Sequence, residues 1–247
     1  MKKYSKDLVA ARTAEDVRRA HAQGKIAVLM GVEGGHMIGN DIRMVRIFSD
    51  LGVRYMTLSH FYNDEWADSS TDKPAHNGLT DYGKDIVREM NRQGMLVDIS
   101  HVGDKTFYDA LEISKAPLIA SHSSCRALCN HPRNLDDEQL DAIRDVGGVV
   151  QITAVAAFLR PDAKPEAVTV ADFTDHIDYA VRRIGIEHVG ISSDFDGGGG
   201  FSGWHDASES ANLTVELLRR GYDRQEIAAL WGGNFLRVLR KAEELAD

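Results

Sequence analysis

Five residues that can bind metal or move protons follow short apolar segments of the chain. Glu33, His60, His101, His122 and Asp194 each stand just after a different segment. Carboxylate and imidazole ligands without a thiolate suit a divalent cation such as zinc, with manganese or cobalt as alternatives. A carboxylate can also bridge two cations about 3.5–4 Å apart, which polarise a carbonyl and activate water near neutral pH. The pattern therefore predicts a metal-dependent hydrolase, in which Asp194 orients the water or accepts its proton.

Other catalytic motifs are weak in this sequence. It contains no GxSxG elbow and no cysteine–histidine arrangement, which disfavours covalent catalysis. The glycine run 197–200 lacks the features of a phosphate-binding loop and is interpreted as a flexible loop over the site. Arg133 lies in a turn shortly after His122, where a forked donor could bind a substrate carboxylate. Six further histidines receive no site role: His21, His76, His131, His176, His188 and His205. His36, three residues beyond Glu33, is expected on the turn, where loop packing would explain it.

Alternating strand and helix patterns must position these residues. Six segments are short and apolar on both faces, which is typical of strands covered on both sides in a parallel sheet. They are residues 26–32, 54–58, 95–99, 117–120, 148–152 and 188–192. Amphipathic helices are predicted over residues 6–23, 41–51, 81–93, 104–114, 136–145, 172–184, 208–220, 225–230 and 234–244. Because parallel strands end at one edge, where the active sites of α/β barrels lie, the five residues should share a site.

The alternation predicts an α/β fold with a parallel sheet, as one domain over residues 1–247. A (β/α)8 barrel needs eight strands, and six are visible. The predicted helix over residues 6–23 would have to follow a strand that the chain does not contain. Two interpretations remain at this point: a six-stranded open sheet, or a barrel that lacks its first units.

Composition narrows the classes of function. The 247 residues are 43% hydrophobic and 27% charged, and no apolar run is long enough to span a bilayer. A formal net charge of −9 argues against a nucleic-acid partner. Cys125 and Cys129 form no disulfide framework and are interpreted as small semi-buried thiols in a reducing compartment. No apolar segment follows the first lysines, so no signal peptide is predicted and a cytoplasmic location is expected.

Several stretches together resemble the membrane dipeptidase family, also called renal dipeptidase or peptidase family M19. In chain order these stretches read GKIA, GVEGGH, LGVRYMTLSH, GLT, VDISH, SHSS, RN, SDFDG and GGNF, at residues 24–27, 31–36, 51–60, 78–80, 97–101, 121–124, 133–134, 193–197 and 232–235. The match runs from about residue 6 to residue 240, in order and with family-like spacing.

The resemblance implies a (β/α)8 TIM-barrel metallohydrolase of the amidohydrolase type that cleaves dipeptides at a binuclear zinc centre. Glu33 would bridge the two ions, and His101 and His122 would complete one of them. The resemblance further implies that His60 contacts the tetrahedral intermediate, Arg133 binds the substrate's C-terminal carboxylate, and Asp194 is the catalytic acid and base.

The sequence departs from the family at its beginning. In the family, a His-x-Asp pair at the end of the first strand supplies the other metal site, and no such pair occurs before Glu33. We therefore expect a barrel without its first two βα units. Three functions remain open: a zinc dipeptidase, a related amidohydrolase acting on another small amide or acyl amino acid, and a non-catalytic metal-binding or assembly module. Dimerisation is common in such barrels, so a homodimer is a candidate assembly.

Overall fold

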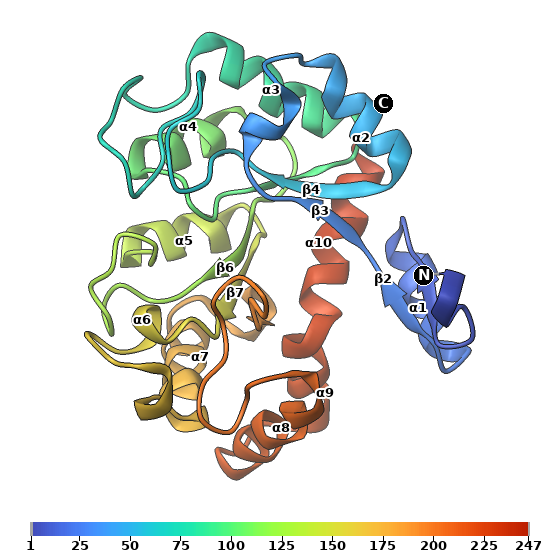
Figure 1. The fold of residues 1–247 in the computed structure, drawn as a ribbon, viewed down its shortest axis with the longest axis vertical. Helices are drawn as coiled ribbons and strands as arrows, with labels where there is room; N and C mark the ends of the chain where they lie inside the picture. The colour runs from blue at the N-terminus through green and yellow to red at the C-terminus, as the bar shows by residue number, and fades with distance from the viewer. Residues whose placement is uncertain (1, 247) are drawn as a thin grey trace. The chain divides into compact units, whose positions relative to one another are not determined.

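The computed structural model describes residues 2–246 of the protein (Figure 1). Met1 and Asp247, the ends of the domain expected over residues 1–247, lie outside the described residues. The chain divides into two compact units. The first comprises Met1–Leu118 with Leu236–Asp247, and the second comprises Ile119–Phe235.

The first unit carries three parallel strands whose carboxyl ends bear candidate site residues. In pairing order they are β3 (Met30–Val32), β4 (Val53–Thr57) and β5 (Leu96–Asp98). The helices of this part of the chain are η1 (Lys2–Tyr4), α1 (Ala14–Ala22), η2 (Gly35–Ile38), α2 (Arg43–Leu51), α3 (Asp81–Arg92) and α4 (Asp104–Ile113). Figure 1 shows α2 beside α3, and α3 also packs against α4. Every residue of β5 is buried, as predicted for a strand covered on both faces.

The beginning of the chain differs from the prediction of one helix over residues 6–23. Residues 8–10 form a strand, β1 (Leu8–Ala10), which pairs in parallel with β2 (Ile26–Val28). Helix α1 begins only after Thr13, whose hydroxyl accepts the Asp16 amide while the Asp16 carboxylate accepts the Thr13 amide. This capping box fixes the start of α1 after the extended segment. Because β1 precedes α1 and pairs with β2, the expectation that no strand precedes the first helix was wrong. The predicted strand 26–32 is likewise two strands, β2 and β3.

The second unit repeats the alternation of strand and helix. Its parallel strands pair in the order β6 (Ile119–Ser123), β7 (Val149–Thr153) and β8 (Val189–Ser192). Its helices are α5 (Asp137–Asp145), α6 (Ala156–Leu159), η3 (Pro165–Ala167), α7 (Val170–Ile184), η4 (Ile186–His188), η5 (Ala207–Glu209), α8 (Ser210–Arg219), α9 (Arg224–Ala228) and η6 (Ala229–Gly233). The last helix of the chain is α10 (Asn234–Glu244). Among the described residues, no helix is both long and apolar enough to cross a membrane.

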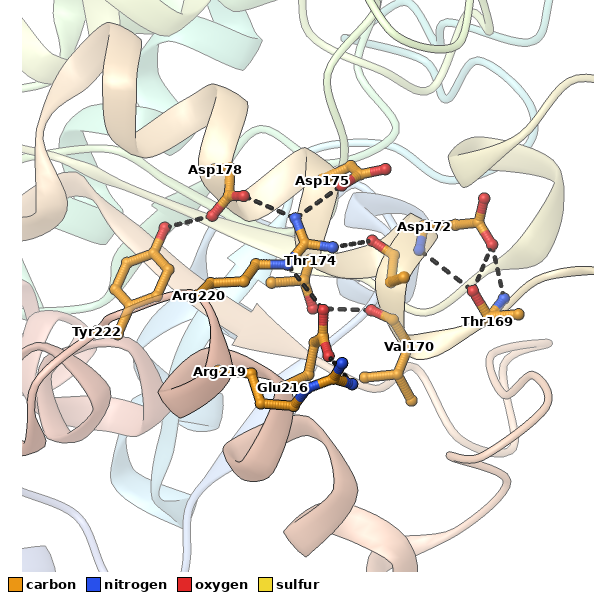
Figure 2. Close-up of polar contacts among 11 residues, drawn as sticks. Thr169, Val170, Asp172, Thr174, Asp175, Asp178, Glu216, Arg219, Arg220 and Tyr222 are labelled. Carbon is orange, nitrogen blue, oxygen red and sulfur yellow. Dashed lines mark hydrogen bonds and ion pairs between the residues drawn. The ribbon is translucent and has the colours of Figure 1, made fainter.

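A charged cluster fastens α7 to α8 within the second unit (Figure 2). The Arg220 guanidinium lies 2.6 Å from carboxylate oxygens of both Asp175 and Asp178, and 2.9 Å from Glu216. The Tyr222 hydroxyl donates to Asp178 at 2.7 Å. Because one guanidinium pairs with three carboxylates, of which those of Asp178 and Glu216 are partly buried, this cluster links the two helices.

Candidate active site

Glu33 stands at the carboxyl end of β3, on a turn that only glycine can form. Gly34, the next residue, has φ +100°, and its amide donates to the Thr57 hydroxyl at 2.5 Å. A Cβ on Gly35 would collide with the buried indole of Trp66. The Glu33 side chain remains 47% exposed. The two glycines therefore turn the chain sharply at the end of β3 and leave the carboxylate accessible.

His101 follows β5 in a strained backbone conformation. It is buried and has φ +71°, which is uncommon for a residue other than glycine. Its carbonyl accepts hydrogen bonds from the Ser70 amide at 2.7 Å, the Ser69 hydroxyl at 3.3 Å and the Ser59 hydroxyl at 3.4 Å. These donors hold the strained residue so that its Nε2 lies 3.0 Å from Glu33 Oε1.

His60 lies beside both of these residues. Its Nε2 is 3.6 Å from Glu33 Oε1, and its ring centroid is 4.4 Å from that of His101. The Ser69 hydroxyl donates to the His60 carbonyl at 2.5 Å. The predicted convergence of Glu33, His60 and His101 is therefore present in the first unit.

The loop that follows His60 is held by two carboxylates. Asp68 accepts the amides of Ala75, His76 and Gly78. Burial opposes ionisation of Asp68, but these amide donors outweigh it and lower its pKa. Burial raises the pKa of Asp64 to about 7, although two backbone amides donate to its carboxylate. The loop thus carries one carboxylate that ionises readily and one that ionises near neutral pH.

His122 and Arg133 lie together in the second unit. His122 is within β6 rather than after it, and its Nδ1 is 2.6 Å from the Ser121 hydroxyl. The buried Arg133 guanidinium is 3.4 Å from the His122 carbonyl and lies over the Phe158 ring at 5.4 Å. The backbone amide of Arg133 donates to His131 Nδ1 at 3.1 Å.

Asp194 lies on the loop that follows β8 and is half-buried. Its backbone is left-handed, with φ +50°, and its carbonyl accepts the amides of Gly197 at 3.0 Å and Gly199 at 2.9 Å. The glycine run is needed here because a Cβ on Gly199 would collide with the Ser193 carbonyl. The loop predicted to be flexible thus contains a hydrogen-bonded turn at Asp194, in which Gly199 is tightly placed.

The side chains of the first unit fit a divalent cation. One carboxylate oxygen has two imidazole nitrogens within 3.6 Å, and carboxylate oxygen and imidazole nitrogen are zinc ligands. Zinc can displace the proton that such a carboxylate–imidazole pair shares, because it binds the deprotonated forms. The donor set thus suits metal chemistry.

Sequence reasoning missed the residues that position these groups. The residue types of Thr57, Ser69 and Trp66 do not indicate a site role, and these residues contact the site only in the folded protein. His131 and His176, which received no site role, support the loop of Arg133: His176 Nδ1 accepts the Cys125 amide at 3.1 Å. The aromatic Phe158 beneath Arg133 had no signal in the sequence either.

Comparison with known proteins identifies relatives over the whole chain. The family described as membrane dipeptidase (peptidase family M19) matches residues 1–247. Dipeptidase tcpJ of Claviceps purpurea is 43% identical over 248 residues, which cover 100% of this chain and 58% of that protein. The chain thus spans less than two thirds of the length of this curated relative.

Solved structures show the same fold. The probable dipeptidase PvdM of Pseudomonas aeruginosa matches with a TM-score of 0.96 and 33% identity, over 99% of this chain and 76% of that one. A metallopeptidase of Rhodobacter sphaeroides, liganded with a phosphinate mimic of the dipeptide L-Ala-D-Ala, matches with a TM-score of 0.89 and 31% identity, over 95% of this chain and 69% of that one. These matches confirm the predicted α/β fold of the (β/α)8 metallohydrolase type. The expected absence of two βα units stays a prediction.

Proposed function

Because the chain belongs to the membrane dipeptidase family, peptidase family M19, we propose that it hydrolyses dipeptides with the help of a bound metal ion. The observation that carries this proposal is the carboxylate of Glu33 with the imidazoles of His60 and His101 beside it. Two relatives support the substrate class: one is a dipeptidase, and the other is liganded with a dipeptide mimic.

Zinc is the proposed ion, with Glu33, His101 and His122 as the ligands that membership of this family implies. These are the residue types that zinc prefers; Glu33 follows β3, His101 follows β5, and His122 lies in β6. If His122 donates its Nδ1 hydrogen to Ser121, its Nε2 is deprotonated and suited to bind metal. In a binuclear centre, Glu33 would bridge a second ion. The metal content per chain measures this directly.

The remaining roles are those that the family resemblance implies, and each suits the chemistry of its side chain. A bound divalent ion supplies Lewis acidity for the scissile carbonyl and for the attacking water. The Asp194 carboxylate accepts a proton from that water and returns it to the leaving amine. His60 Nε2 donates to the substrate oxygen that gains negative charge. The Arg133 guanidinium, held over Phe158, pairs with the substrate's C-terminal carboxylate.

The test combines metal analysis with a dipeptide panel. Zinc-loaded protein should hydrolyse dipeptides, and Glu33→Gln should lose both bound zinc and turnover. Glu65→Gln makes the same charge change at an exposed residue of the neighbouring loop and should retain both. Hydrolysis of an acyl amino acid with dipeptides untouched would favour a related amidohydrolase. Tight binding of one metal without any turnover would favour a non-catalytic module.

A further inference from the structure

Phe61 is an apolar ring left largely in water beside the candidate metal ligands. It is 52% exposed. Its ring centroid lies 4.1 Å from that of His60 and 5.4 Å from that of His101, with the latter contact edge-on at 80°. Both imidazoles lie close to the Glu33 carboxylate. An exposed ring is unremarkable alone, but this one borders the groups that would bind and cleave a peptide.

The backbone around Phe61 is fixed before any ligand binds. The Thr71 hydroxyl donates to the Phe61 carbonyl at 2.7 Å, and the Ser69 hydroxyl donates to the preceding carbonyl at 2.5 Å. Two residues later, the Asn63 amide donates to the Asp72 carboxylate at 3.1 Å. A backbone held in this way loses little conformational entropy when a ligand packs against the Phe61 ring.

Phe61 differs in polarity from the candidate site residues beside it. Glu33 and His60 offer polar atoms that suit a peptide group, whereas Phe61 offers only an apolar face or edge. A substrate side chain that covers Phe61 removes apolar surface of both partners from water, at about 25 cal/mol per Å². A glycine residue has no side chain with which to do so.

We propose that Phe61 determines substrate specificity, by forming an apolar wall that selects dipeptides with a bulky apolar side chain over dipeptides of glycine. The inference rests on the proposed dipeptidase function and deepens it. Phe61 acts through contact with the substrate and takes no part in the proton transfers.

The adjacent residue provides a matched control. Tyr62 is also aromatic and is 77% exposed, and within residues 2–246 its ring makes no recorded contact with His60 or His101. If any exposed aromatic residue of this loop sufficed, Phe61 and Tyr62 would behave alike. If the position beside the imidazoles matters, only Phe61 variants should change specificity.

The first experiment measures kcat/KM for Gly-Gly and for dipeptides that contain leucine or phenylalanine at either position. The wild-type protein should prefer at least one bulky position. Phe61→Ala should lower kcat/KM for that substrate about tenfold relative to Gly-Gly, since loss of a few apolar contacts has effects of this size. Tyr62→Ala should leave the ratio within about twofold. Phe61→Gln, which retains much of the side-chain volume, keeps the test valid if Phe61→Ala folds poorly.

A second experiment measures binding without turnover. Phosphinate dipeptide mimics with small and with bulky side chains are titrated calorimetrically into wild-type and variant protein. Phe61→Gln should remove the preference for the bulky mimic and leave the affinity for the small one within about twofold.

The outcomes separate this inference from the proposed function. The wild-type protein could hydrolyse dipeptides while Phe61 variants lose kcat/KM and affinity by the same factor for all substrates and mimics. That result would overturn the specificity role alone. A wild-type preference for Gly-Gly over every bulky dipeptide would also overturn it. Wild-type protein that hydrolyses no dipeptide and binds no dipeptide mimic would overturn both proposals.

Discussion

Replacing Asp64 by asparagine should make the protein more stable at alkaline pH and should change little at acidic pH. Burial raises the pKa of the folded-state carboxyl from an ordinary value of 3.8 to about 7. Below about pH 3 the carboxyl is largely protonated in both states, and its ionisation then costs little. As the pH rises from about 4 to 7, the unfolded chain loses a proton that the folded protein keeps, so stability falls. Above about pH 7 both states are ionised and the penalty is constant.

The structure sets the magnitude of this effect. A pKa difference of about three pH units corresponds to about 4 kcal/mol in full, of which roughly 2–3 kcal/mol develops between pH 5 and pH 8. Asp64 is only half-buried, and solvent lowers the expected change to about 2 kcal/mol. Asparagine keeps the acceptor for the Trp66 and Ala67 amides, at 3.1 and 2.8 Å, and it stays neutral at every pH. Its amide group replaces Asp64 Oδ2, which is buried without a hydrogen-bond partner among the described atoms.

Urea unfolding of wild-type and Asp64→Asn protein at pH 5, 6, 7 and 8, in one metal buffer, measures the difference in free energy of unfolding. Fluorescence of the buried Trp66 can report on this loop. The variant's advantage should grow with pH. Asp68→Asn provides a control of opposite sign, because the pKa of Asp68 is lowered and its ionised form stabilises the fold. An Asp64→Asn advantage that is equal at pH 5 and pH 8, or that shrinks as pH rises, would refute the reasoning.

Three further predictions concern the substrate, the turn and the helix fastening. Arg133→Ala should raise KM for dipeptides with a free C-terminal carboxylate about tenfold or more, because a charge-assisted hydrogen bond is lost. KM for amidated dipeptides should change far less. Equal changes in KM for both kinds of dipeptide would rule out the carboxylate contact. Gly35→Ala should lower the melting temperature and weaken zinc binding, because its Cβ would collide with Trp66; unchanged zinc affinity would contradict this. Arg220→Met should cost about 2 kcal/mol of stability in thermal unfolding, because it leaves carboxylates without their cation. Arg219→Met, which removes an arginine whose side chain is 76% exposed, should cost less than about 1 kcal/mol. Equal losses in the two variants would show that the additional Arg220 contacts in Figure 2 do not stabilise the fold.

The sequence by itself determined the class of fold and the main candidate residues. Apolar segments of four to seven residues between amphipathic stretches are local patterns, and each reports burial of its own element. The residue types at the ends of these segments are also read directly, which is how Glu33, His101 and Asp194 were found. The strand at residues 8–10 escaped this reasoning because Leu8 and Val9 also fit one face of a helix, and pairing with β2 decided between the two.

The tertiary structure alone decided how the candidate groups are held. The left-handed backbone of His101 depends on donors from Ser59, Ser69 and Ser70, which are distant in sequence and adjacent only after folding. The placement of Phe61 against two imidazoles depends in the same way on hydrogen bonds across its loop. The residue type at each position can be read from the sequence alone, whereas backbone strain, burial and contacts depend on residues that meet only in the folded protein. For that reason the sequence could indicate metal chemistry, and only the fold could reveal an apolar wall beside it.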